Sequence, residues 1–116
     1  MLWGIGLFSL AAPVAAAPLP KPPGFTICGV CHKVQAGAPS ALGPNLWGVG
    51  GRKAGTLPGY AYSPAMKKFG KPWTRAELIA FLTQPSRVVP GNKMAYAGQR
   101  DPKLAAALAD YLLSLK

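Results

Sequence analysis

The chain has 116 residues, enough for one small domain, and carries thirteen Lys and Arg against three acidic residues, for a net charge of +10. Nucleic-acid binding is one reading of so basic a chain, but the basic residues are scattered, and neither a helix-turn-helix pattern nor a basic stripe interleaved with aromatic residues accompanies them. We therefore expect no nucleic-acid binding, and a basic surface that meets acidic protein partners or, transiently, an anionic membrane surface.

Residues 1–17 have the pattern of a secretory signal peptide. They carry no charge, and their apolar run ends in small residues with an Ala-x-Ala-like site at 15–17. The absence of Lys or Arg before the apolar run is atypical. A retained anchor is the alternative, although about 20 apolar residues are needed to span a bilayer and Pro13 interrupts this stretch. We expect cleavage after Ala17 and a periplasmic protein.

Residues 18–24, PLPKPPG, contain four prolines in seven positions and predict a stiff, extended lead-in, because proline is excluded from helix interiors. The domain proper is then expected over residues 25–116. A short helix is predicted from about 25 to 34, and it would carry both cysteines and the only histidine of the chain in the segment CGVCH, residues 28–32.

Three chemistries could use Cys28, Cys31 and His32 together. A structural zinc ion needs four ligands, and no further Cys or His is present. A dithiol redox motif belongs after a strand in a βαβ unit, which the surrounding sequence does not predict, and a disulfide would leave the histidine unexplained. Covalent haem attachment uses every position: the two thiols bond to the porphyrin and the imidazole turns to the iron. The motif alone can arise by chance, so the rest of the chain decides.

The next elements are a long loop and two short helices. Residues 35–62 are rich in Gly and Pro without a period, and so long an irregular loop is unusual unless it wraps something. Ser63 and Pro64 predict the start of a helix that ends at Gly70. A capping box at residues 74–77 opens another helix, which stops at Pro85 and has Leu78, Phe81 and Leu82 on its apolar face.

Residues 85–100 are predicted to be a loop, and Asp101 and Pro102 then open a last helix. Its apolar stripe follows helical spacing and comprises Leu104, Leu108, Tyr111, Leu112 and Leu115. The fold class is therefore all-α, with short helices joined by long ordered loops. Such a chain has too little apolar surface of its own, and a bound haem would complete its core.

Several separated motifs resemble class I cytochromes c of the mitochondrial and bacterial c2 type. In chain order they are CGVCHKV, GPNLWGVGGRKAG, GYAYSPAMK, Trp73, PGNKMAYAG and LADYLLSL, and they span Cys28 to Leu115. The resemblance implies the small cytochrome c fold around one haem c, bound covalently through Cys28 and Cys31, with His32 as an iron ligand.

The resemblance also implies the second iron ligand. Met1 is lost with the signal peptide, and Met66 lies in the helix predicted from residue 64, where methionine is ordinarily a core residue. The family's ligand is the methionine of its PG-x-K-M motif, which is Met94. Ligation by His and Met raises the reduction potential of a haem.

The remaining site residues follow from the same motifs. The carbonyl of Pro44 would accept the imidazole N–H and fix the ring. Arg52, Tyr62 and Trp73 match residues that hydrogen-bond to or screen the haem propionates. Asn92 and Tyr96 would shape the pocket beside the methionine.

Two departures from the family stand out. Phe81 occupies a position where tyrosine is usual, so a hydroxyl contact to the methionine sulfur is absent. The family's long first helix is excluded by the prolines of residues 18–24. We therefore expect the shortened 25–34 helix to cross the end of the last helix, with Phe25 near Tyr111 or Leu108, and with Ile27 and Val30 as the other available cover.

The function implied is that of a monomeric electron carrier, not an enzyme, moving between a bc1-type donor and a terminal oxidase or another acceptor. Lys33, Arg87, Lys93 and Arg100 are candidates for the face around the haem edge. Two other classes remain open: a peroxidase-like enzyme or sensor with a labile sixth ligand, and a dithiol oxidoreductase without haem.

Overall fold

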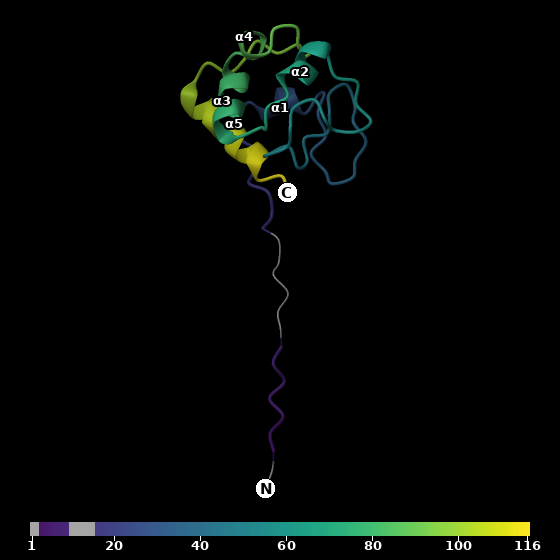
Figure 1. Cartoon of the computed structure of the whole chain (residues 1–116). Coiled ribbons are helices and arrows are strands. Elements are labelled where there is room, and N and C mark those ends of the chain that lie inside the picture. Colours follow the sequence, from purple (N-terminus) through teal and green to yellow (C-terminus); the bar gives the residue numbers. More distant parts are fainter. Residues whose placement is uncertain (1–2, 10–15) are drawn as a thin grey trace.

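The computed structural model describes residues 3–9 and 16–116, and Figure 1 shows short helices and long loops gathered in one body. The described residues contain no strand, and their only β pairing is an isolated bridge between Lys53 and Pro72. The predicted all-α fold is confirmed. The helices are α1 (Phe25–Cys28), α2 (Pro64–Phe69), α3 (Arg75–Thr83), α4 (Pro85–Val88) and α5 (Pro102–Leu113).

The predicted signal segment is described only in part. Residues 3–9 and 16–17 have irregular backbone and exposed side chains, and the rest of residues 1–17 lies outside the described residues. Among the helices of the described chain, none is both long and apolar enough to cross a membrane.

The helices begin where side chains satisfy their free backbone N–H groups. The Ser63 hydroxyl accepts a hydrogen bond from the Met66 N–H at α2, and the Asp101 carboxylate accepts two at α5. At α3, Thr74 accepts from the Glu77 N–H, but the return bond of a capping box is absent because the Thr74 N–H donates to the Pro72 carbonyl at 2.9 Å.

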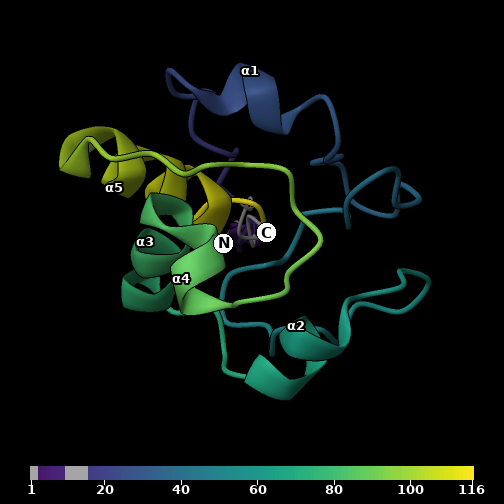
Figure 2. The ribbon, with the colours of Figure 1, turned by 90° about the horizontal axis from the view of Figure 1, so that it is seen from above.

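The packing of α3 on α5 forms the core. Figure 2 shows these two helices side by side, with α1 and α2 at opposite margins of the body. The predicted face of α3 is buried. Of the predicted apolar stripe, Leu108, Tyr111 and Leu112 of α5 and Leu115 just beyond it are buried, whereas Leu104 in the first turn of α5 is only half-buried. On the outside of the pair, the Arg75 guanidinium bonds to the Asp110 carboxylate at 2.8 Å.

The first helix is shorter than predicted. It ends at Cys28, and residues 29–31 form a turn instead of continuing to 34. Phe25 packs edge-on against Tyr111, with ring centroids 4.9 Å apart, which confirms the predicted contact. The expectation that Ile27 and Val30 would also cover α5 is wrong, because these side chains are 59% and 72% exposed.

Part of the missing cover comes from the proline-rich lead-in. The Leu19 N–H donates to the Ser114 hydroxyl at 3.0 Å, and that hydroxyl in turn donates to the Tyr111 carbonyl at the end of α5. Lys21 places its ammonium 5.7 Å from the centre of the Phe25 ring. Residues 18–22 thus run past the C-terminal end of α5 without helical structure, as the prolines require, whereas Pro23 and Gly24 form a turn into α1 instead of continuing the predicted extended lead-in.

The prediction of a loop throughout residues 85–100 is also wrong, because α4 forms one helical turn at its start. Pro85 ends α3, since proline cannot donate the backbone hydrogen bond that a continuing helix needs. The same residue suits the first position of a new helix, where that N–H would be unpaired in any case.

Truncating Phe25 should destabilise the haem-loaded protein strongly. Phe25→Ala is expected to lower the free energy of unfolding by more than about 2 kcal/mol, because buried aromatic side chains cost about 3–5 kcal/mol on truncation. Urea unfolding followed by tryptophan fluorescence measures it. Val30→Ala, at a 72% exposed position nearby, is the control and should be near neutral. Equal stability of the two variants would show that Phe25 does not cover α5.

Candidate functional site

A largely apolar cavity of about 380 Å³ opens inside the body, in the size range of small-molecule sites. Segments far apart in the sequence line it: α1 and its following turn, the 42–46 loop, α2, α3, α5 and the loop after α4. All eleven residues predicted for the site lie on its wall: Cys28, Cys31, His32, Pro44, Arg52, Tyr62, Trp73, Phe81, Asn92, Met94 and Tyr96.

The two thiols lie on one tight turn at the edge of the cavity. The Cys31 and His32 N–H groups both donate to the Cys28 carbonyl, at 3.1 and 2.9 Å, and neither cysteine forms a disulfide. Burial raises the pKa of the Cys28 thiol above its ordinary value. A dithiol oxidoreductase needs the opposite, a thiol whose pKa is lowered so that the thiolate is present.

The His32 imidazole is held in its neutral form, with one ring nitrogen free of hydrogen bonds within the protein. Its Nδ1 lies 2.7 Å from the Pro44 carbonyl oxygen, and because a carbonyl can only accept, Nδ1 carries the proton. Burial lowers the pKa of His32, although the bond to Pro44 acts in the other direction. The lone pair on Nε2 is therefore available to a metal.

Gly43 lets the facing loop approach this ring, a role that the sequence analysis missed. A Cβ atom at residue 43 would lie 2.6 Å from Cε1 of His32, and the Gly43 N–H donates to the Cys31 carbonyl at 2.9 Å. Its position directly before the predicted Pro44 was the available signal.

The loop that carries Met94 is fixed from both sides of that residue. The Asn92 side chain accepts from the Met94 N–H at 2.8 Å and donates to the Val89 carbonyl at 3.0 Å. Beyond it, the Gln99 N–H donates to the Leu82 carbonyl at the end of α3. These bonds hold the backbone of the loop, and the Met94 side chain lies half-buried on the cavity wall.

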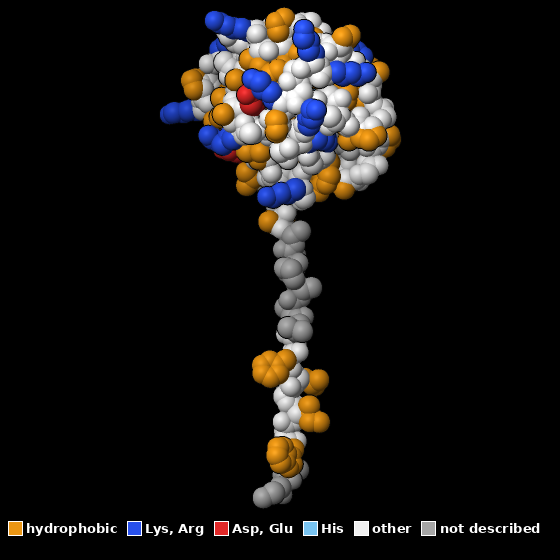
Figure 3. Space-filling model, viewed as in Figure 1, with side chains coloured by type: hydrophobic (Ala, Val, Ile, Leu, Met, Phe, Trp, Pro, Cys, Tyr) orange, Lys and Arg blue, Asp and Glu red, His pale blue; other side chains and the backbone are white. Residues whose placement is uncertain are grey.

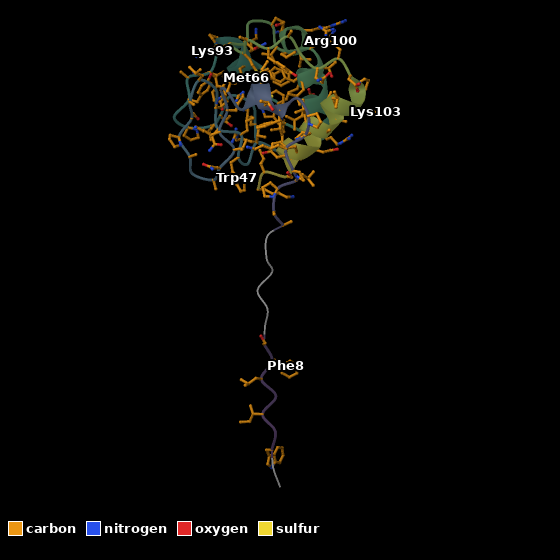
Figure 4. All side chains as sticks on the ribbon, turned by 180° about the vertical axis from the view of Figure 1, so that it is seen from behind. Phe8, Trp47, Met66, Lys93, Arg100 and Lys103 are labelled. Atoms are coloured by element: carbon orange, nitrogen blue, oxygen red, sulfur yellow. The ribbon has the colours of Figure 1, made fainter. Side chains whose placement is uncertain are left out.

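Lys93 adds a second anchor that the sequence did not predict. Its ammonium donates to the Ala61 carbonyl at 2.6 Å and lies 5.3 Å from the centre of the Tyr60 ring. The Tyr60 hydroxyl in turn donates to the Leu42 carbonyl at 3.2 Å. These contacts join the methionine loop to the loop that packs on His32. Figure 4 shows Lys93 at the end of the body away from Trp47.

Tyr96 brings the methionine loop close to the thiols. Burial raises the pKa of its hydroxyl, and the proximity of Cys28 raises it further. Met66 of α2 also lines the cavity, so the site contains two thioether side chains, of which the loop residue Met94 follows the predicted ligand motif.

Arg52 and Tyr62 present polar groups on an otherwise apolar wall. The Arg52 guanidinium donates to the Trp47 and Asn45 carbonyls at 3.2 and 3.3 Å, which leaves further N–H donors free. The Tyr62 oxygen accepts from the Leu57 N–H at 3.3 Å, so its own proton is free to donate. A ligand with carboxylate groups would find donors here.

Aromatic rings close another part of the wall. Trp73 has its ring centroid 5.5 Å from that of Phe69 and 5.1 Å from that of Phe81. This part of the wall is largely apolar: Phe81 lacks the hydroxyl of a tyrosine, and the indole N–H of Trp73 is the one polar group of the three rings.

The chemistry of these groups fits a haem. Two thiols at one edge, a neutral imidazole, thioether side chains and an apolar wall with carboxylate donors match what a covalently bound porphyrin iron requires. They do not fit a structural zinc ion: across residues 3–9 and 16–116, no group of three or more His, Cys, Asp or Glu side chains is placed to hold a metal ion.

Gly43→Ala should displace the His32 ring, because the added methyl group cannot fit within 2.6 Å of it. We expect the haem content of the exported protein to fall about tenfold or more, the range for residues that orient a metal ligand. The ratio of Soret to protein absorbance measures this. Gly29→Ala is the matched control, since its φ is −63° and its nearest contact lies at 3.6 Å. Equal haem content in both variants would contradict the role given to Gly43.

Known proteins are similar to this chain in sequence and fold, although no protein-family model matches it. Cytochrome c2 iso-2 of Magnetospirillum molischianum is 45% identical over 95 residues, covering 82% of this chain and 97% of the relative. Cytochrome c2 of Blastochloris viridis is 39% identical over 111 residues, covering 92% and 87%. The structure of cytochrome cH from Methylobacterium extorquens superposes with a TM-score of 0.71 at 42% identity, over 76% of this chain and 88% of that one. The chain therefore belongs to the class I, c2-type monohaem cytochromes c, electron carriers with one haem c bound through a Cys-x-x-Cys-His segment, here residues 28–32.

Proposed function

We propose that His32 and Met94 would hold the haem iron, and that the iron held in this way would be low-spin and would serve an electron carrier. The observation that carries this is that both side chains lie on the wall of one cavity, where Pro44 fixes the His32 ring and the Asn92 side chain fixes the backbone of Met94. When bound, the haem supplies the iron centre that takes up and releases one electron. Ligation by His and Met would raise its reduction potential.

The other site residues hold and shield this centre. We propose that the free donors of Arg52 and Tyr62 bind the haem propionates, since buried carboxylates need hydrogen-bond partners. Trp73 and Phe81 exclude water from the same cavity. Lys93 ties the methionine loop to the Ala61 carbonyl by a hydrogen bond, and we propose that it positions Met94 in this way.

The redox partners are proposed to be proteins with acidic docking surfaces, a bc1-type complex as donor and a terminal oxidase or other acceptor. The net charge of +10 supports this, and Figure 3 shows basic side chains spread over the visible face with few acidic ones. Opposite charges steer such proteins together and raise their encounter rate. We propose that the carrier is a monomer and transforms no substrate.

A peroxidase-like enzyme or sensor is the competing function. It would require Met94 to leave the iron readily, and Met66 on the same cavity wall offers a second thioether. The anchors of the methionine loop at Asn92 and Lys93 favour the carrier, because they resist that movement.

Removing Met94 tests the ligand assignment. The ferric protein should show the weak long-wavelength charge-transfer band of methionine-ligated haem, and Met94→Ala should abolish it. Met66→Ala is the matched control and should retain the band, because its side chain fills the wall without binding iron. Loss of the band in Met66→Ala and its survival in Met94→Ala would reverse the assignment.

Export is proposed from the sequence of residues 1–17, with cleavage after Ala17 and function in the periplasm. Attachment of haem to reduced thiols outside the cytoplasm is consistent with it. N-terminal sequencing of the exported protein should find Pro18 as the first residue. Finding Met1 or Leu2 there would instead establish a retained N-terminal segment.

A further inference from the structure

The Pro44 carbonyl that bonds to His32 belongs to a peptide group whose other end is also bonded. Pro44 and Asn45 share this trans peptide group, so the Pro44 carbonyl and the Asn45 N–H lie in one plane and point in opposite directions. The carbonyl accepts from Nδ1 of His32 at 2.7 Å. The N–H donates to the hydroxyl oxygen of Ser40 at 3.0 Å. Two hydrogen bonds thus run in series from His32, through one peptide plane, to Ser40.

The loop around Ser40 holds its hydroxyl opposite this peptide group. The Asn45 side chain, in a residue only 6% exposed, donates to the Gln35 and Ala38 carbonyls at 2.7 and 2.9 Å. Its oxygen accepts from the Trp47 N–H at 3.1 Å. Ala38 and Asn45 lie on either side of Ser40 in the chain, so the bond between them fixes the stretch that carries the hydroxyl.

Hydrogen bonds arranged in series strengthen one another. A peptide group that donates through its N–H has a more polar carbonyl, and the strengthening is about 10–30% per bond. A stronger bond from Nδ1 to that carbonyl makes the imidazole a more basic metal ligand. Ser40 does not line the haem cavity, so its influence reaches the His32 ring through the peptide group.

We propose that Ser40 is a positioning residue for the iron ligand. Its hydroxyl oxygen holds the Asn45 N–H, orients the Pro44 carbonyl, and thereby sets the strength of the hydrogen bond to His32 and the reduction potential of the haem. This rests on the proposed role of His32 as an iron ligand. A more basic imidazole favours ferric over ferrous iron, because the ferric ion carries the greater positive charge. Loss of the Ser40 hydroxyl should therefore raise the reduction potential.

The reduction potential of the exported, haem-loaded protein tests this. Ser40→Ala should shift the redox equilibrium with a reference couple about twofold or more toward the ferrous form, since about 10–30% of one bond to the ring is at stake. In NMR spectra of the ferric protein, the His32 Nδ1 proton should exchange with solvent deuterium about threefold or more faster than in the wild type, because a weaker bond to the carbonyl protects it less.

Restoring a hydroxyl at the same position separates the hydrogen bond from the rest of the side chain. Ser40→Thr keeps the hydroxyl oxygen, and its added methyl group has room, because Ser40 lies on the wall of a second cavity of about 320 Å³ beside residues 57–59. This variant should have the potential and the exchange rate of the wild type.

Ser114→Ala is the matched control. The Ser114 hydroxyl is also half-buried and also accepts from a backbone N–H, that of Leu19, at 3.0 Å, but it lies at the end of α5 and does not line the haem cavity. Its loss should leave the potential and the exchange rate unchanged.

An unchanged or lower potential in Ser40→Ala would overturn the role of Ser40 while leaving His32 as an iron ligand. Equal shifts in Ser40→Ala and Ser40→Thr would also overturn it, because the hydroxyl would then not be the cause. A ferric wild type whose His32 ring protons lack a paramagnetic shift would instead contradict the ligand role of His32, and the proposal with it.

Discussion

The hydrogen bond between His32 Nδ1 and the Pro44 carbonyl, 2.7 Å long, joins the haem-binding turn to the loop that faces it. It fixes the tautomer of the ring, and so leaves the lone pair of Nε2 available to a metal. Gly43 makes the approach possible, since a methyl group there would overlap the imidazole. Next to Gly43, the Leu42 carbonyl accepts a hydrogen bond from the Tyr60 hydroxyl. The Tyr60 ring in turn contacts the ammonium of Lys93, which lies in the methionine loop on the other side of the cavity. These contacts link the loop that holds the His32 ring to the loop that carries Met94.

The helices that line the cavity are short, and we expect their stability to depend on the haem that they bind. The longest, α5, has 12 residues, and helices shorter than about 12–15 residues are marginal by themselves in water. Leu78, Leu82 and Leu108 are core residues that also face the cavity, so the apolar faces of α3 and α5 meet each other on one side and the haem on the other. A domain of this size buries a small fraction of its surface by itself, and a porphyrin in the cavity would add to the buried apolar surface.

Local chemistry explains why some elements could be predicted from the sequence and others could not. The starts of three helices were predictable because each is capped by a local side chain: Ser63, Thr74 or Asp101. The last helix was predictable also because its apolar residues repeat with a helical period. The site residues were predictable because their motifs are distinctive and recur in a known family. The extent of α1, by contrast, is set by the turn that bends His32 back to its cavity, and the docking of Leu19 on Ser114 joins residues 95 positions apart. Such long-range contacts leave no periodic signal in either segment.

The central claim is that the haem completes the core, and amide hydrogen exchange tests it most directly. We would compare the haem-loaded protein with the Cys28→Ser, Cys31→Ser chain, which cannot attach the cofactor, under the same conditions. The account predicts that the amides of α3 and α5 are strongly protected with haem and lose most of that protection without it, together with the near-ultraviolet circular dichroism of Trp73 and its aromatic neighbours. Equal protection of these helices in both chains would show that the protein core is complete without the haem and would contradict the account.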